Sequence, residues 1–369
     1  MIRPRPLYFV LKRYVYIAAL LFYKRFTIHQ AKNVPLKGPV IFVPNHQNAF
    51  MDAIMVAVTT PRKPWFLTRA SIFGSAMARY WLSSLRMIPI YRIRDGLQNV
   101  RKNDETMEIC LDLLKNNETI LIFAEGNHNR QWMLRPLQKG LSRISFSYES
   151  MNNFTGGLKI IPVGLQYESH KQFRSDLLIT YGTPICVSDY KDIYYSDPLK
   201  ATTQLIEDVR KGLSAIIVDI PQTMDYDTAK LAIQQRPCRE NNLVERLKSD
   251  KAFVLKNDFS VENKSHSSSI LLRLVGFPVF VYGAINHLFI YLIIKYLLKK
   301  VIKDDHWTSS IKFAGMIIVS PIFYALQSWL LWQFVPDWAC IISYIVSLPF
   351  AAAIAGDYWY KYLKYSRIS

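Results

Sequence analysis

The sequence predicts an α/β fold with membrane helices attached to it. Three observations lead to this prediction. Short apolar runs alternate with helical stretches from residue 38 to about residue 190. Two uncharged segments, of 22 and 19 residues, lie near the end of the chain. The net charge is +18 on 369 residues, and a charge of this size implies an anionic partner, either nucleic acid or a membrane surface.

Residues 1–37 are expected to form a basic, helical segment that lies on a membrane surface. Residues 7–23 are apolar and aromatic, but Lys12 and Arg13 interrupt them. Seventeen residues with two central charges make a poor membrane span and a good interfacial helix. A cleaved signal peptide is not indicated, because no small-residue cleavage site follows the apolar stretch.

Residues 38–190 are expected to form one α/β domain with a sizeable core. Met107, Cys110, Leu111 and Leu114 have the spacing of one helix face, and Asn103 or Asp104 can cap that helix. Residues 119–124 are apolar on both faces, which is typical of a central strand. The strand-like runs are 40–43, 64–67, 87–91, 119–124, 159–163 and 177–181.

Residues 191–269 become polar and are expected to be a helical extension followed by a linker. The break falls at Arg236, Pro237 and Cys238, and the serine-rich residues 265–269 are the linker. The four cysteines are widely separated and form no C-x-x-C motif, so they indicate neither a disulfide framework nor a zinc site.

Residues 270–369 are expected to be a membrane domain. Segments 313–334 and 338–356 are each long enough to cross the bilayer, and only three residues separate them, so they predict a transmembrane hairpin. Residues 275–294 contain Gly276, Pro278 and His287 and are expected to be re-entrant or interfacial. Basic residues flank the hairpin on both sides, so both flanks, and the α/β domain, are expected on the cytoplasmic side.

His46 and Asp52 are the first candidates for chemistry. His46 follows the apolar run 39–43, and Asp52 is the first acidic residue of the chain. A histidine whose tautomer is fixed by a carboxylate can take a proton from a hydroxyl at neutral pH. Residues six apart cannot meet on one helix face, so the loop between them must bulge.

Three further blocks lie at the ends of expected strands, where α/β folds place their chemistry. Together with the His46 block, they resemble in order and spacing the four motifs of the glycerolipid acyltransferases related to lysophosphatidate acyltransferase. The resemblance covers residues 38–185 and implies a central mixed sheet flanked by helices. The three blocks are MIPIYRIR at 87–94, IFAEGNHNR at 122–130 followed by LRPLQKG at 134–140, and IIPVGL at 160–165.

Two departures from the family pattern bear on the acceptor. Five residues separate His46 from Asp52, where the family usually has four, and Ala124 replaces the usual proline before Glu125. The longer spacing and the Leu-Arg-Pro-Leu stretch at 134–137 resemble the fungal glycerol-3-phosphate and dihydroxyacetone-phosphate acyltransferase branch. The resemblance therefore favours glycerol 3-phosphate as acceptor.

The resemblance also implies roles for the motif residues. His46 is expected to be the general base and Asp52 the group that orients it and stabilises its cation. Arg92 matches the phosphate-binding arginine of the second motif. Glu125 and Gly126 match the third motif, where the glycine lets backbone approach substrate and the glutamate binds or orients the acceptor.

Weaker candidates surround this set. Asn45 either donates to the oxyanion or caps a turn. Arg130 is a candidate for binding the acceptor phosphate, with a solvated surface role as the alternative. His128 is expected to be a loop residue, because no family role falls on it. Pro162 and Gly164 are expected to shape the pocket.

The resemblance thus predicts a membrane-bound O-acyltransferase of phosphatidic acid biosynthesis that acylates glycerol 3-phosphate, and also dihydroxyacetone phosphate. The acyl donor is expected to be acyl-CoA or acyl-carrier protein, with no cofactor, and no metal-ligand spacing appears. Lysophosphatidate is the alternative acceptor, and a CoA-independent transacylase is a third member of the class. A basic, membrane-tethered nucleic-acid-binding protein would explain the charge but not the motifs, and the chain has no Gly-aromatic RNA-binding signature. A catalytically dead membrane scaffold predicts loss of His46 or Glu125, and both are present.

Overall fold

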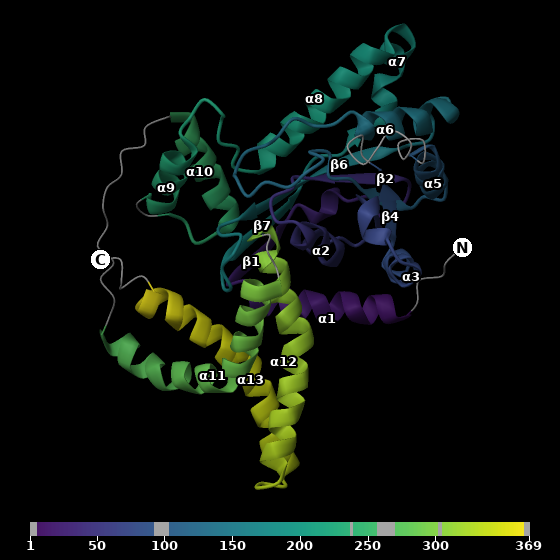
Figure 1. Cartoon of the computed structure of the whole chain (residues 1–369). Helices are drawn as coiled ribbons and strands as arrows, with labels where there is room; N and C mark the ends of the chain where they lie inside the picture. Colours follow the sequence, from purple (N-terminus) through teal and green to yellow (C-terminus); the bar gives the residue numbers. More distant parts are fainter. Residues whose placement is uncertain (1–5, 92–102, 237–238, 257–269, 302–304, 365–369) are drawn as a thin grey trace.

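One mixed sheet forms the centre of the α/β part of the molecule (Figure 1). The structure is a computed structural model that describes residues 6–91, 103–236, 239–256, 270–301 and 305–364. The strand order is β1-β7-β6-β2-β5-β3-β4, and β8 lies beside β6. The strands are β1 (Arg25–His29), β2 (Val40–Pro44), β3 (Pro64–Arg69), β4 (Met87–Ile90), β5 (Thr119–Leu121), β6 (Lys159–Tyr167), β7 (Asp176–Tyr181) and β8 (Ile185–Cys186).

The sheet is mixed, as expected. The central strand β2 is parallel to both neighbours, β5 and β6, and β3 is parallel to β4 and β5. β7 and β8 are antiparallel to β6, and β1 is parallel to β7. The carboxyl ends of β2, β5 and β6 therefore meet at one edge of the sheet, where the expected motifs follow.

Helices cover both faces of the sheet. Successive residues of a strand point to opposite faces, so one strand contributes side chains to both of the core clusters under these helices. Val40 and Phe42 of β2 belong to the core cluster that includes α1 (Pro6–Phe22) and α2 (Phe50–Thr59). Ile41 and Val43 belong to the cluster that includes α5, α6 and α8. These three helices are α5 (Asn103–Lys115), α6 (Gly140–Met151) and α8 (Pro198–Ile216).

Strand β1 differs from the expectation that residues 1–37 are helical. Helix α1 ends at Phe22, and the chain enters the sheet three residues later. β1 pairs with β7 over five residues, and Arg25 forms an ion pair with Asp176 at 2.6 Å. This short edge strand, RFTIH, has a charge at one end and only partly buried residues, so its apolar signal is weak.

Strand β5 also differs, because it ends at Leu121 and not at residue 124. Ile122 still donates its N–H to Phe42 O, and the chain then turns so that Gly126 N bonds to Phe123 O at 3.0 Å. Gly126 has φ +71°, a conformation that glycine adopts without strain. This turn brings Glu125 back towards β2.

The helical extension follows the sheet. Its helices are α7 (Lys191–Ser196), α8, α9 (Tyr226–Gln235) and α10 (Leu243–Lys256). Trp132 and Leu178 pack with α9 and α10 in a third core cluster. Pro237, Cys238 and the expected linker 265–269 lie outside the described residues.

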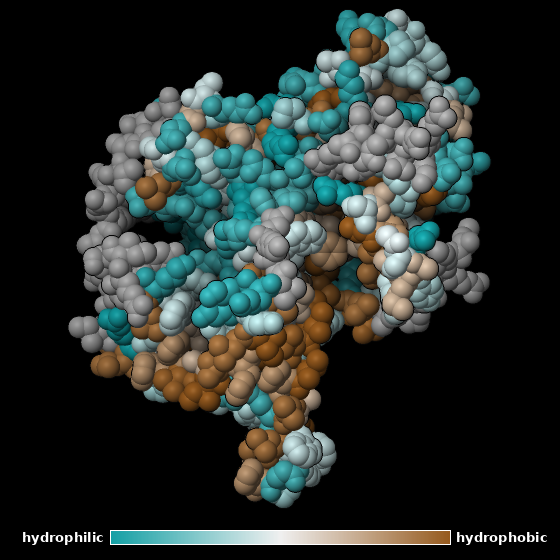
Figure 2. Space-filling view, in the orientation of Figure 1, coloured by the Kyte–Doolittle hydropathy of each residue, from teal (hydrophilic) through white to brown (hydrophobic). Residues whose placement is uncertain are grey.

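Three apolar helices follow, each long enough to cross a membrane by length and composition. They are α11 (Ile270–Tyr296), α12 (Thr308–Trp332) and α13 (Trp338–Tyr358). The α12–α13 hairpin projects away from the sheet, and Figure 2 shows a hydrophobic surface on it and on the adjoining helices. Residues 275–294 lie in one continuous helix, and the expected re-entrant or interfacial position of this segment stays a prediction.

Candidate active site

The site lies in the loop between β2 and α2. β2 ends at Pro44, His46 follows, and Asp52 lies in the first turn of α2. The loop bulges at Ala49, whose φ of 45° and ψ of −126° are rarely adopted by a residue with a side chain. Strained backbone of this kind is held in place only by its surroundings and is concentrated at functional sites. The bulge lets two residues six apart meet, as their spacing requires.

His46 and Asp52 form a hydrogen-bonded pair. His46 Nδ1 lies 2.8 Å from Asp52 Oδ2, and Asp52 is fully buried. The backbone N–H groups of Gln47 and Asn48 donate to the same oxygen at 2.8 Å, and the Tyr167 hydroxyl donates to Asp52 Oδ1 at 2.8 Å. Four donors and the positive end of α2 therefore surround the Asp52 side chain.

This pairing fixes the tautomer of His46. Because the carboxylate accepts the proton of Nδ1, the other nitrogen, Nε2, carries the lone pair that can accept a proton. The His46 side chain keeps 14% of its surface exposed. Phe123 stacks on the imidazole with ring centroids 3.8 Å apart and holds the orientation of the ring.

Glu125 supports the loop that carries His46. Its Oε1 accepts the backbone N–H of His46 at 2.8 Å, so the third motif contacts the first directly. Burial raises the pKa of Glu125 to about 7, although backbone hydrogen bonds from His46 and Arg135 act in the opposite direction. Gly126 faces Gln138, whose Cγ lies 3.3 Å from where a Cβ would stand.

Asn45 differs from the expected substrate-binding role. Its side chain is 1% exposed, Oδ1 accepts Leu165 N at 2.7 Å, and Nδ2 donates to Leu165 O at 3.1 Å. This two-point contact fixes β2 against β6 just before His46. Asn45 thus serves as a cross-strand anchor, and its amide oxygen and nitrogen are both engaged.

Arg130 also differs from expectation. Its Nη1 donates to Asp305 Oδ2 at 2.8 Å, and Nη2 donates to the Asp305 carbonyl oxygen. Asp305 precedes α12 and also pairs with Lys171. The guanidinium therefore connects the catalytic domain to the membrane domain and does not stand free to bind phosphate.

Two further candidates remain, Arg92 and His128, and the structure describes only the second of them. Arg92, the expected phosphate-binding arginine, lies outside the described residues. His128 is described: its ring centroid lies 5.5 Å from that of His46 and 4.7 Å from that of His306. His306 comes from the segment before α12, so the membrane domain contributes to the surroundings of the site.

Sequence reasoning missed Tyr167. It lies two residues beyond the last expected motif, on a strand that continues four residues past its expected end. Val163, Leu165 and Tyr167 share one face of β6 because side chains alternate along a strand. This alternation could have indicated from the sequence that Tyr167 points towards Asp52. Burial and the charge of Asp52 raise the pKa of Tyr167 well above its ordinary value, so the phenol remains a donor.

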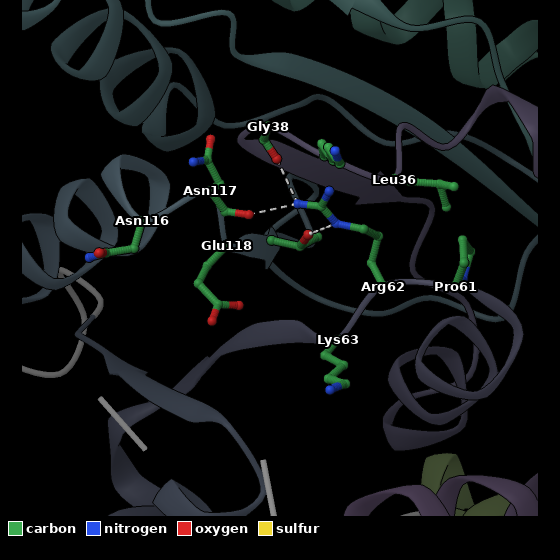
Figure 3. Close-up of a pocket in the computed structure, with 10 residues that line it drawn as sticks. Leu36, Gly38, Pro61, Arg62, Lys63, Asn116, Asn117 and Glu118 are labelled. Atoms are coloured by element: carbon green, nitrogen blue, oxygen red, sulfur yellow. Dashed lines mark hydrogen bonds between the residues drawn. The ribbon is translucent and has the colours of Figure 1, made fainter. Parts of the chain in front are cut away.

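A surface cavity of about 570 Å³ lies at the other end of the sheet (Figure 3). It lies beside the first residues of β2, β3 and β5, whereas His46 and Glu125 follow the carboxyl ends of β2 and β5. The Arg62 guanidinium beside it donates to Gly38 O, Asn117 O and Thr119 Oγ1 at 2.6–2.8 Å. These contacts join three chain segments, so Arg62 has a structural role there.

Comparison with known proteins shows what this part of the chain is similar to. Residues 25–166 match the family model described as Acyltransferase. Glycerol-3-phosphate O-acyltransferase 2 of Saccharomyces cerevisiae is 28% identical over 127 residues, which cover 34% of this chain and 17% of that protein. The chloroplastic 1-acyl-sn-glycerol-3-phosphate acyltransferase BAT2 of Brassica napus is 24% identical over 159 residues, which cover 43% of this chain and 42% of that protein. The match thus spans less than half the length of each of these relatives.

A solved structure also resembles the chain. The crystal structure of the 1-acyl-sn-glycerophosphate acyltransferase PlsC from Thermotoga maritima aligns with 57% of this chain and 79% of its own, with 15% identity and a TM-score of 0.40. The family model covers the segment that carries His46, Asp52 and Glu125. Residues 25–166 are thus similar to the family described as Acyltransferase.

Proposed function

We propose that this chain is a membrane-bound O-acyltransferase that transfers a fatty acyl group from acyl-CoA or acyl-carrier protein to glycerol 3-phosphate. The observation that carries the proposal is the pair of His46 Nδ1 and Asp52 Oδ2, 2.8 Å apart, on a buried and fully hydrogen-bonded carboxylate. This pair supplies a base with one defined accepting nitrogen beside the carboxyl ends of the strands. Acyl transfer to a hydroxyl needs such a base.

The proposed reaction begins at His46 Nε2. This nitrogen takes the proton of the acceptor hydroxyl while the oxygen attacks the thioester carbonyl and forms a tetrahedral oxyanion. The imidazolium is stabilised by Asp52, whose charge lies 2.8 Å from Nδ1. The oxyanion then collapses, the carbon–sulfur bond breaks, and the leaving thiolate takes the proton from Nε2. The products are an ester and a free thiol, and His46 returns to its starting state.

Glu125 acts through His46 in this scheme. The hydrogen bond that it accepts from the His46 backbone N–H holds the loop that carries His46 in position. We assign Arg92 the role of binding the acceptor phosphate, since a guanidinium matches that group and the second motif supplies it. Glu125 and Gly126 would then line the space between this phosphate and the imidazole.

The choice of glycerol 3-phosphate rests on two observations. The His46–Asp52 spacing and the stretch 134–137 resemble the fungal branch. Two relatives from Saccharomyces cerevisiae are named glycerol-3-phosphate O-acyltransferases, while the two plant relatives are named 1-acyl-sn-glycerol-3-phosphate acyltransferases. The plant relatives make lysophosphatidate the second candidate acceptor.

The proposed setting is the cytoplasmic face of a membrane. Lys299 and Lys300 precede the α12–α13 hairpin, and Lys361 and Lys364 follow it. Positive residues on both flanks favour a hairpin with both ends in the cytoplasm. The catalytic domain would then face cytoplasmic acyl donors.

An acceptor assay tests the proposal. Membranes with the full chain would receive labelled palmitoyl-CoA together with glycerol 3-phosphate, dihydroxyacetone phosphate or lysophosphatidate, and the lipid product would be identified. Lysophosphatidate formed from glycerol 3-phosphate is the expected result. Turnover with lysophosphatidate alone would replace the acceptor, and no turnover with any of them would overturn the proposal.

The variant His46→Ala tests the base. We expect its rate to fall by about 10²–10⁴-fold, because removal of a general base costs that much. The matched control is His29→Ala on the edge strand β1, which should retain the rate of the unmodified chain. Retention of activity in a folded His46→Ala protein would contradict the assignment.

A further inference from the structure

Helix α3 (Ala76–Ser84) has no buried residue. Met77 is 73% exposed, Tyr80 56% and Trp81 59%. These residues have the i, i+3, i+4 spacing of one helix face, so they form a single apolar stripe. Ile72 before the helix and Leu85 after it are exposed as well.

Water alone does not stabilise such a helix. Isolated helices shorter than about 12–15 residues are marginal, and most helical stability in proteins comes from packing one face against a neighbour. α3 has nine residues, and Ser75 caps it through one hydrogen bond from Ala78 N at 3.0 Å. We therefore expect a membrane or another protein surface to cover the exposed stripe.

The opposite face of α3 ties it to the catalytic core. Leu82 and the preceding Phe73 pack against the cluster that holds Phe66 and Met87, which Phe123 also joins. Phe123 is the ring that stacks on His46. The face of α3 opposite the stripe and the ring that stacks on His46 thus pack against the same core cluster.

The hydrophobic surface of the membrane helices continues towards α3. The Tyr14 hydroxyl of α1 donates to Ile317 O of α12 at 2.6 Å, so α1 adjoins a candidate span. Phe9, near the other end of α1, lies 4.0 Å below the ammonium of Lys63, which directly precedes β3. Figure 1 shows α3 beside this end of α1, and Figure 2 shows hydrophobic side chains along that flank.

The first quarter of the sequence, which contains α3, is strongly basic. Residues 1–94 contain 15 Lys and Arg and a single acid, Asp52, which is buried. Arg69, before the stripe in sequence, and Arg79, between Met77 and Tyr80, are both exposed. Basic side chains beside an apolar helix face are typical of helices that lie in the interface of anionic membranes.

We infer that α3 is a bilayer-contacting helix, which inserts Met77, Tyr80 and Trp81 into the interfacial layer of a phospholipid membrane. The catalytic domain then rests on the membrane at two places, α1 and α3, in addition to its C-terminal spans. This contact lies beside the acyltransferase site but does not depend on which acceptor the site uses.

Photocrosslinking tests the contact without measuring activity. The full chain would be reconstituted in vesicles of phosphatidylcholine and phosphatidylglycerol, with p-benzoylphenylalanine in place of Tyr80 or Trp81. Lipid adducts would be quantified by mass spectrometry. Tyr195 on α7 is a matched control because it is an aromatic residue 60% exposed and far from α1 and α3 (Figure 1). Trp329 on α12 is the positive control.

We expect about tenfold more phospholipid adduct at positions 80 and 81 than at position 195, since interfacial side chains contact lipid continuously. Adducts at 329 but none at 80 and 81 would overturn the inference. Adducts to another segment of this chain or to a second copy of it would also overturn it, because protein would then cover the stripe.

A second measurement uses Tyr80→Ser with Trp81→Ser and the control Tyr195→Ser. In the same vesicles, the double variant should lose most of the lipid-induced blue shift of a dye placed at position 77, while the control keeps it. An unchanged shift in the double variant would contradict the inference, and this readout stays valid even if the proposed acyl transfer fails.

Discussion

Tyr167 reaches the active site from the far end of β6 and supplies the only described side-chain hydroxyl that contacts Asp52. Hydrogen bonds to a charged group contribute roughly 1.5–3 kcal/mol each. Loss of this donor leaves more negative charge on the carboxylate, which favours the cation of His46. In the proposed mechanism, the hydroxyl would therefore adjust the basicity of His46 in addition to its contribution to the fold.

The variant Tyr167→Phe is expected to lower kcat/KM about tenfold and to move the acidic limb of its pH profile to higher pH. Measurement of kcat/KM from pH 5 to 9 would detect both effects. Tyr181→Phe is the control, because that buried hydroxyl bonds to Thr59 and not to Asp52. A shift of the limb in the control alone would contradict the role of Tyr167.

Glu125 makes stability depend on pH. Burial raises its pKa from 4.5 to about 7, so the folded state favours the protonated form. Stability from this group is fully present below pH 4.5 and is lost as pH rises through about 7. The difference corresponds to about 3 kcal/mol.

Glu125→Gln removes this titration and keeps an oxygen that can accept the His46 N–H. The free energy of unfolding of the variant should therefore rise relative to the unmodified chain between pH 4.5 and pH 7, by up to about 3 kcal/mol. Denaturant titrations in detergent at several pH values measure the difference. A constant difference across this range would contradict the raised pKa.

At the scale of the element, the start of α2 carries the strain. Ala49 precedes the helix with a positive φ, whereas Ala53 lies inside it. We expect Ala49→Gly to raise the free energy of unfolding by up to about 1 kcal/mol, because glycine relieves strain but adds entropy to the unfolded chain. Ala53→Gly should lower it by about 1 kcal/mol. Thermal unfolding compares the two, and equal losses in both would show that Ala49 is not strained.

Several elements could be predicted from sequence because their signals are local. The apolar run at β2 and the helical spacing of Met107, Cys110, Leu111 and Leu114 each determine one element. β1 could not be predicted, since its pairing with β7 joins residues about 150 apart and leaves its side chains half-exposed. The same limit hid α3, whose apolar stripe matches no expected core face.

The candidate site could also be predicted only in part from the sequence. His46, Asp52 and Glu125 lie together as their motifs indicate. The partners of Asn45 and Arg130 could not be predicted, because Leu165 and Asp305 are 120 and 175 residues away. Polar side chains near a motif can bind substrate or anchor the fold, and only their spatial neighbours decide which.

At the scale of the whole molecule, Asp305 joins the membrane domain to the catalytic domain through Arg130 and Lys171. The neighbouring His306 approaches His128 and thereby the surroundings of His46. This junction lets the position of α12 influence the site, although exposed ion pairs contribute at most about 1 kcal/mol to stability.

Asp305→Asn should therefore lower kcat/KM by about threefold to tenfold while changing the melting temperature by only a few degrees. Steady-state kinetics and thermal unfolding in the same vesicles separate the two effects. Asp337→Asn, at the tip between α12 and α13, is the control and should leave kcat/KM unchanged. Equal kinetic losses in both variants would show that the junction has no special role.

The short connection between α1 and β1 has a mechanical consequence. Tyr23 and Lys24 are the only residues between a helix that adjoins α12 and a strand hydrogen-bonded into the sheet. A connection of two residues allows little movement between α1 and β1. It therefore cannot adjust to a bilayer that is thicker or thinner than the spans. In the proposed membrane setting, hydrophobic mismatch would instead tilt the hairpin or the whole α/β domain.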